Sequence, residues 1–212
     1  MVSRTQPGKT SKIVTEQFTD AKSHRRTEKG RELSVKWLPD EAKKQLEAQK
    51  TKEWKKHIDH DMFDMCPELT EASLKAQGKN VLKMRYVITD KAETRRAGQT
   101  VEEVPMELKA RLVTPGFADT DNLAGKLKKD APTLPAEAVG VILQCAASKK
   151  WKIAHTDVEA AFLSGAYFSR EIYVIAPFGG LPAVGYQAAV PVGIVMRLKK
   201  SMPGLADAPL EW

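Results

Sequence analysis

The chain has 212 residues, of which 42% are hydrophobic and 29% charged, with a formal net charge of +7. This length and composition allow one domain with a tail or two small domains, each with a packed core. Cys66 and Cys145 provide neither a disulfide framework nor a zinc-ligand spacing, so we expect a reducing compartment, cytoplasmic or nuclear.

The positive charge is concentrated in the first part of the chain. Residues 1–60 hold 15 Lys and Arg against 9 Asp and Glu, a net of +6, whereas residues 61–212 hold 19 against 18, a net of +1. We predict a mostly disordered or helical basic arm over residues 1–38 and a folded domain over 39–212. A basic arm suits contact with nucleic acid through phosphate neutralisation. A solubilising tail explains the same composition.

The pattern after residue 39 alternates between helices and strands. A helix begins after Pro39, with acidic residues first and lysines last. Strands are predicted at Val81–Thr89 and Leu108–Val113, the second ending before Pro115 and Gly116. A helix follows Pro135, with a buried face predicted at Val139, Ile142, Leu143 and Ala146.

Three more strands complete the predicted fold. They are expected at Trp151–Asp157, near Glu171–Ile175 and near Val192–Leu198. Mixed strands and helices in this order predict an α+β fold. The segment Val174–Met196 carries no charge over 23 residues, but its prolines and glycines exclude a membrane helix, so we expect a soluble protein without membrane contact.

Asp157 is the most informative single residue. The alternation from Trp151 onward predicts a strand that ends at this carboxylate, where open sheets collect their ligands. The same residues satisfy a capping box, since Thr156 precedes Glu159 by three positions. Asp157 is therefore either a site carboxylate or a residue at a helix start.

Two further groups carry charges that suit a ligand. Lys109 and Arg111 alternate along a predicted strand, so both side chains lie on one face, where they could bind a polyphosphate or simply face solvent. A second group would share one helix face and could hold a divalent metal, although a polar helix face explains it equally: His57, His60, Asp61 and Asp64. No phosphate-binding glycine loop or nucleophile-elbow serine is present in the sequence.

Taken in order, four segments resemble the reverse transcriptase of copia-type LTR retrotransposons. KARLVTPGFAD (109–119) resembles the family's KARLVARGF, and the block 130–165 resembles a PT motif, a helix, a Trp and DVKTAFLNG. EIYVIAP (171–177) resembles EIYMEQP, and RLKKSMPGLADAPLEW (197–212) resembles KLKKALYGLKQAPRAW. The resemblance covers roughly residues 50–212, and four ordered blocks are far more specific than any one of them.

The resemblance implies a partial fingers and palm and a set of site residues. Asp157 would be the first metal-binding carboxylate, with the Val158 carbonyl as a further ligand of Mg²⁺ in a two-metal site. Lys109 and Arg111 would bind the incoming dNTP, and Phe162 would exclude a 2′-hydroxyl unless it is simply a core aromatic. The base pair and template would pack against a last group: Gly204, Leu205, Ala208 and Pro209.

Departures from the family pattern weaken parts of this assignment. Pro203, Leu210 and Pro115 replace a Tyr, an Arg and a basic residue of the motifs. The family's second pair of aspartates, on a Tyr/Phe-x-Asp-Asp hairpin, is expected after Trp212, which leaves the two-metal site incomplete.

We therefore expect a segment of an RNA-directed DNA polymerase, a fragment of a Pol polyprotein that is inactive as an isolated chain. Its partners would be an RNA or DNA template with primer, and dNTP. The alternatives are a non-catalytic nucleic-acid-binding remnant and a degenerate open reading frame.

Overall fold

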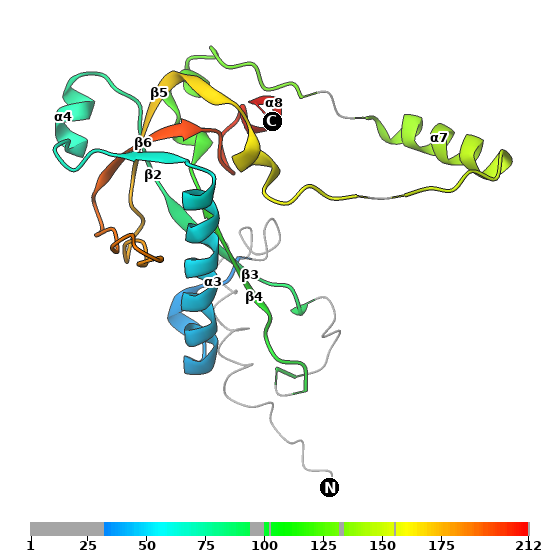
Figure 1. Cartoon of the computed structure of the whole chain (residues 1–212), viewed down its shortest axis with the longest axis horizontal. Coiled ribbons are helices and arrows are strands. Elements are labelled where there is room, and N and C mark those ends of the chain that lie inside the picture. The colour runs from blue at the N-terminus through cyan, green and yellow to red at the C-terminus, as the bar shows by residue number, and fades with distance from the viewer. Residues whose placement is uncertain (1–31, 94–99, 102, 132–133, 155, 212) are drawn as a thin grey trace, which may run out of the picture.

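The computed structural model describes residues 32–93, 100–101, 103–131, 134–154 and 156–211. Helices and two β-sheets are mixed along the chain, which confirms the predicted α+β class (Figure 1). The predicted basic arm lies outside the described residues as far as residue 31. Within the described part of the chain, no helix is both long and apolar enough to cross a membrane.

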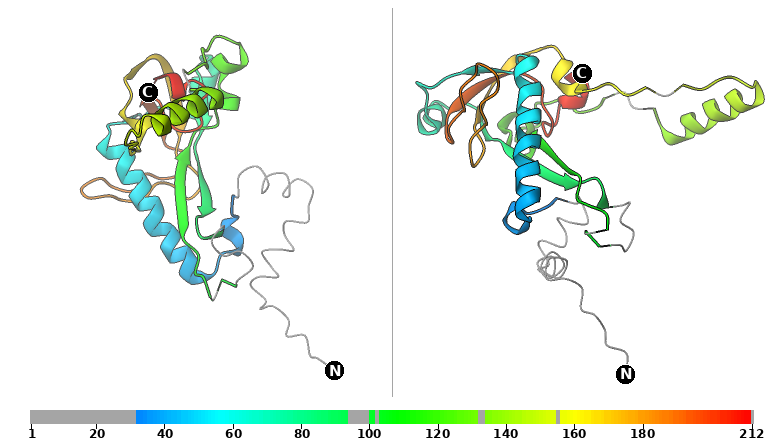
Figure 2. Two further views of the ribbon diagram at one scale, coloured as in Figure 1. Left: turned by 90° about the vertical axis from the view of Figure 1, so that its right-hand side faces the viewer. Right: turned by 60° about the horizontal axis from the view of Figure 1, so that its bottom comes forward.

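Helix α3 (Asp40–Asp59) follows a short 3-10 turn, Val35–Trp37, and begins directly after Pro39 as predicted. It lies along a two-stranded antiparallel sheet formed by β3 (Arg85–Asp90) and β4 (Leu108–Val113), as Figures 1 and 2 show. Apolar side chains of the helix, of the sheet and of Leu38, which precedes the helix, form a shared core: Leu38, Ala42, Leu46, Ile88, Leu108 and Ala110. Burial of this apolar surface fixes the helix on the sheet.

A second sheet has four strands in the order β1-β6-β5-β2. They are β1 (Phe63–Met65), β2 (Val81–Lys83), β5 (Tyr167–Ile175) and β6 (Val195–Lys200). Strands β2 and β5 run parallel, and the other neighbours are antiparallel. The main core is built here around fully buried residues that include Ile172, Val174, Met196 and Leu198.

The single strand predicted over residues 81–89 is two strands in the structure. Residues 81–83 pair with β5 in the four-stranded sheet, and residues 85–90 pair with β4 in the other sheet. Met84 is buried between them, and its N–H still donates to the Ile175 carbonyl over 3.1 Å. One apolar run therefore links the two sheets, which periodicity alone does not reveal.

The remaining helices are short. They are α4 (Glu71–Ala76), which starts at a capping box between Thr70 and Ser73, α6 (Thr120–Leu123) and α8 (Ala208–Glu211). Two 3-10 turns, Gly116–Ala118 and Ala161–Ser164, follow β4 and precede β5. These elements place the ends of β4, β5 and β6 close to one another.

Helix α7 (Ala136–Ser148) projects away from the other elements, as Figure 1 and the right-hand view of Figure 2 show. Its predicted start after Pro135 is confirmed, but its predicted buried face is wrong. Val139, Ile142 and Leu143 are exposed, and Ala146 alone of that face is buried. We call residues 126–160 the α7 segment.

The strand predicted at Trp151–Asp157 is also wrong for the residues that the structure describes there. Residues 151–154 and 156–158 have neither strand nor helix, so the capping-box alternative is not formed either. Trp151 and Ile153 are exposed. Alternation predicts which side chains a strand would bury, but a strand also needs a neighbour that offers a free edge.

Candidate functional site

Lys109 and Arg111 lie on β4, with Leu108, Ala110 and Leu112 buried between and beside them. The alternation therefore places both cations on the face opposite the core, as predicted. No salt bridge to either side chain is found among the described residues. Burial and the positive charges of Arg111 and Lys91 lower the pKa of Lys109. Glu53 attracts Lys109 and opposes this shift. Two cations this close, without a salt bridge among the described residues, favour an anionic ligand.

Helix α3 completes the free edge of β4. The N–H of Leu108 donates to the Gln45 side chain over 3.2 Å, and the N–H of Leu112 donates to Glu53 Oε1, also over 3.2 Å. Edge N–H groups of a strand otherwise remain open to pairing with another chain. Strand β4 is thus held at both edges, by α3 on one side and by β3 on the other.

The chain after β4 is joined to the loop after β6 by backbone hydrogen bonds. The N–H of Thr114 donates to the Pro203 carbonyl over 3.0 Å, and the N–H of Gly116 donates to the Gly204 carbonyl over 2.9 Å. We call this contact between residues 114–119 and 203–207 the loop joint. Gly204 has φ +101°, and a Cβ on it would overlap the Thr114 carbonyl, so glycine is required here.

The residues predicted to pack against template and base pair divide into two kinds. Leu205 and Ala208 are buried in the main core, whereas Gly204 and Pro209 are exposed. Phe162 is partly buried against the same core, in the 3-10 turn before β5. Phe162 thus lies at the edge of the main core, which agrees with the alternative that it is a core aromatic.

Asp157 and Val158 lie in the α7 segment and are both exposed. Among the described residues, Asp157 has no hydrogen bond or salt bridge. Two residues further along the chain, Glu159 Oε1 accepts a hydrogen bond from Lys56 of α3 over 2.6 Å. The loop joint is thus held by several contacts, whereas the Asp157 carboxylate is held by none among the described residues.

The described residues do not assemble a metal site. They contain no group of three or more His, Cys, Asp or Glu side chains placed to hold a metal ion. The residues around Asp157 therefore do not by themselves fit the two-metal centre that the sequence motifs imply.

The alternative metal set expected on one helix face is not formed, because α3 ends at Asp59 and Asp64 lies in β1. His57 is fully buried, and its Nδ1 lies 2.9 Å from the Glu53 carbonyl oxygen. Asp61 and Asp64 instead pair with Lys199, over 2.5 and 3.4 Å.

Sequence reasoning missed a buried charged cluster beside the loop joint. Arg170 of β5 donates to Asp119 over 2.8 Å and to Asp207 over 2.6 Å. Asp119 is fully buried and Asp207 nearly so. The partners are 51 and 37 residues from Arg170 in the sequence, so no local spacing links them. The one available signal was a single Arg in a strand that becomes wholly apolar two residues later.

Comparison with known proteins gives a consistent result. A model of the protein family described as reverse transcriptase (RNA-dependent DNA polymerase) matches residues 74–212. The retrovirus-related Pol polyprotein from transposon TNT 1-94 of Nicotiana tabacum is 33% identical over 109 residues, which are 49% of this chain. That match spans 7% of the length of the tobacco polyprotein. No solved structure matches the chain.

Proposed function

Because the chain belongs to the reverse transcriptase (RNA-dependent DNA polymerase) family, of the copia type that its motifs indicate, we propose that it binds nucleotide and primer–template for an RNA-directed DNA polymerase. The observation that carries this proposal is a pair of cations on β4, next to the loop joint, that form no salt bridge among the described residues. Lys109 supplies a point charge and Arg111 a planar fork, a combination that suits the phosphates of a dNTP or of a primer–template.

The proposed reaction is transfer of a nucleotidyl group to a primer 3′-hydroxyl. Members of this family use divalent metal, and we assign Asp157, with the Val158 carbonyl, to that metal in the complete centre, with Mg²⁺ as the ion. Since the described residues form no metal site by themselves, further carboxylates are required. We therefore propose that this chain on its own binds but does not polymerise.

Other residues have proposed roles around the nucleotide. Gly204 and Pro209 are exposed on the loop joint and in α8, where template can reach them. Leu205 and Ala208 support that loop from the core, and Phe162 supports the sugar from the turn before β5. In fingers and palm terms, α3, β3 and β4 correspond to the fingers, and the four-stranded sheet to part of the palm.

The proposal is tested by the salt dependence of primer–template binding, measured by fluorescence anisotropy. In the double variant Lys109→Ala/Arg111→Ala, the slope of log K against log salt should become shallower by about 2, because two phosphate contacts are lost. Binding at low salt should weaken in the same variant.

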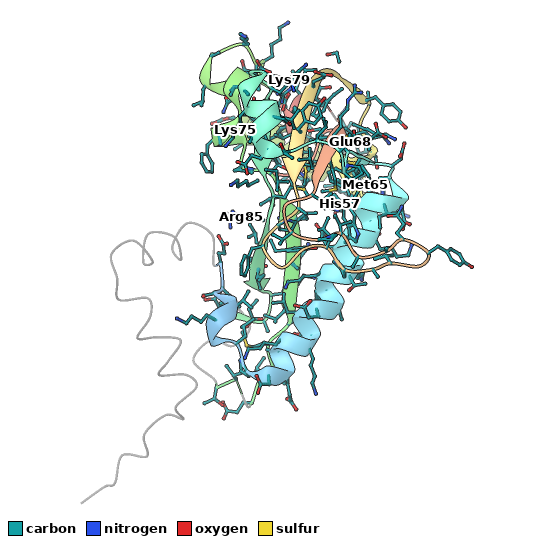
Figure 3. All side chains as sticks on the ribbon, turned by 90° about the vertical axis from the view of Figure 1, so that its left-hand side faces the viewer. His57, Met65, Glu68, Lys75, Lys79 and Arg85 are labelled. Carbon is teal, nitrogen blue, oxygen red and sulfur yellow. The ribbon has the colours of Figure 1, made fainter. Side chains whose placement is uncertain are left out.

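A matched control removes the same two charges elsewhere. Lys75 and Lys79 lie at the α4 end of the molecule, where Figure 3 labels them, and pair with Glu71 and Glu171. Lys75→Ala/Lys79→Ala should retain the wild-type slope. Equal slopes for the two double variants would contradict the assignment of Lys109 and Arg111.

The second candidate function is nucleic-acid binding through the basic N-terminal region without chemistry. Residues 1–31 hold 8 Lys and Arg against 3 Asp and Glu, a net of +5, which favours it. Deleting residues 1–31 leaves every described element in place. Complete loss of binding in that variant would favour this second function over the first.

A further inference from the structure

Arg170 connects three parts of the molecule through one buried guanidinium. It lies on β5, and its two terminal nitrogens reach Asp119, after β4, and Asp207, after β6. The Arg170 side chain is 17% exposed, and the carboxylates of Asp119 and Asp207 are 0% and 5% exposed. Among the described residues, these are the salt bridges in which both side chains are most deeply buried.

The charges in this cluster depend on one another. Burial disfavours the charged guanidinium, but the hydrogen bond to Asp119 and the attraction of Asp207 outweigh it and raise the pKa of Arg170. Asp119 is further held by the Asn80 amide over 2.8 Å and by the N–H of Asp121 over 3.0 Å. One cation thus pairs with two buried carboxylates, and the more exposed Asp121 carboxylate lies 3.6 Å from the same guanidinium. Loss of the cation would leave the two buried carboxylates without a counter-charge.

The cluster fastens the loop joint at a second point. Asp119 comes three residues after Gly116, and Asp207 three residues after Gly204, whose backbones are hydrogen-bonded to each other. The backbone pairs fix how close the two loops lie. The contact from β5 fixes their orientation, because the planar guanidinium donates from its two terminal nitrogens in set directions, one to each carboxylate.

Asp207 also departs from the family motif quoted above, since GLADAP carries Asp where GLKQAP carries Gln. A neutral Gln at this position would remove one of the two buried carboxylates that accept from Arg170.

We propose that Arg170 is a positioning residue that sets the orientation of the β4 loop relative to the Gly204 loop, and thereby aligns Lys109 and Arg111 with the template-contacting residues. This inference rests on the proposed function of nucleotide and primer–template binding. Arg170 itself is a partner of two buried carboxylates and contacts no ligand in this scheme.

The test uses Arg170→Lys in the full chain, because Lys keeps the charge but lacks the fork. Amide hydrogen exchange at Thr114 and Gly116 should accelerate about tenfold, while exchange at Val174 in the core stays unchanged. Primer–template affinity should fall by about tenfold, since misplacing binding groups costs that much without removing any of them. Asp207→Asn, which retains the volume of the side chain, should reproduce both effects.

The double variant Arg170→Lys/Asp207→Asn should bind primer–template no more weakly than the single variant that binds more weakly. The reason is that both substitutions break the same contact. Glu171→Gln is the matched control: Glu171 follows Arg170 on β5, and its salt bridge to Lys79 is exposed and away from the loop joint. This control should retain wild-type exchange and affinity.

The failures are distinguishable. A wild-type chain that binds no primer–template refutes the proposed function before any variant is made. Wild-type binding together with unchanged affinity in Arg170→Lys and Asp207→Asn would overturn the positioning role, even if exchange accelerates, because the cluster would then serve stability alone. Unchanged exchange at Gly116 would show that Arg170 does not hold the loop joint.

Discussion

The loop joint and the α7 segment are held very differently. At the joint, backbone hydrogen bonds, a glycine without room for a Cβ and a buried Arg170 cluster fix two loops. In the α7 segment, a 13-residue helix leaves Val141 63% exposed, and Asp157 is exposed without a partner among the described residues.

This difference distinguishes the residues proposed to bind nucleic acid from the carboxylate proposed to bind the catalytic metal. Binding groups on β4 are attached to an element that β3, α3 and the loop joint all hold. A catalytic carboxylate must be held in a fixed geometry to work, and the contacts that would hold Asp157 are not made by the described residues. On the proposed function, the residues expected to bind a polyanion lie on a well-held strand. The expected metal ligand Asp157 is exposed and has no hydrogen bond or salt bridge among the described residues.

The largest expected effect tests the buried cluster. Arg170→Ala should lower the free energy of unfolding by about 3–5 kcal/mol, because it leaves two buried carboxylates without their cation. Urea denaturation measures this loss. Glu171→Gln, next to it on β5, should give no measurable change because its salt bridge is exposed. A small loss for both variants would show that the cluster is not structural.

The second prediction makes the same substitution in both regions. Gly204→Ala should cost roughly 3 kcal/mol, since φ is +101° and the new methyl group would overlap the Thr114 carbonyl. Gly140→Ala in α7 should instead stabilise the chain by about 0.5–1 kcal/mol, because Gly140 is helical and has open space around it. Thermal unfolding should give a lower Tm for Gly204→Ala and a higher Tm for Gly140→Ala. A change of Tm in the same direction for both variants would contradict the prediction.

The third prediction concerns pH and the core beside α3. Burial lowers the pKa of His57 below its ordinary 6.5, against the smaller opposing effect of Glu53. The unfolded chain therefore takes up a proton first as the pH falls. The contribution of His57 to the free energy of unfolding is fully present above pH 6.5. It should fall by up to about 1.4 kcal/mol per pH unit as the pH drops from 6.5 to the lower pKa of the folded state.

Denaturation curves at several pH values measure this dependence. His57→Leu removes the titrating group and should make the free energy of unfolding less dependent on pH below pH 6.5. An unchanged slope in that variant would assign the pH dependence to other residues.

The smallest expected effect is in α7. Val141→Ala should change stability by no more than about 0.5 kcal/mol, because the side chain is exposed and Ala favours helix. Val174→Ala, the same change at a fully buried position in β5, should cost about 2 kcal/mol. Comparable losses at the two positions would mean that the face of α7 is covered in solution.

The sequence predicted elements well where local signals were complete. The strand Leu108–Val113 has its predicted bounds, because alternation and the following Pro115 and Gly116 agree. The start of α7 after Pro135 is confirmed for a similar reason. Prediction failed where the outcome depends on a distant partner: the alternation from Trp151 forms no strand, and the apolar face of α7 is not buried.

The candidate site was predictable only in part. Placement of Lys109 and Arg111 on one face followed from a period of two residues. The Arg170 cluster did not, since Asp119 and Asp207 come from other segments and their burial is a property of the folded chain. Conversely, Leu205 and Ala208 lie in motif positions but are core residues in the structure.

The most direct measurement is amide hydrogen exchange of the whole chain with and without a primer–template duplex. If β4 and the loop joint bind nucleic acid, protection should appear at residues 109–119 and 203–207, and amides of α7 should exchange at the same rate in both samples. Protection confined to residues 1–31 or to the α7 segment would contradict binding through Lys109 and Arg111.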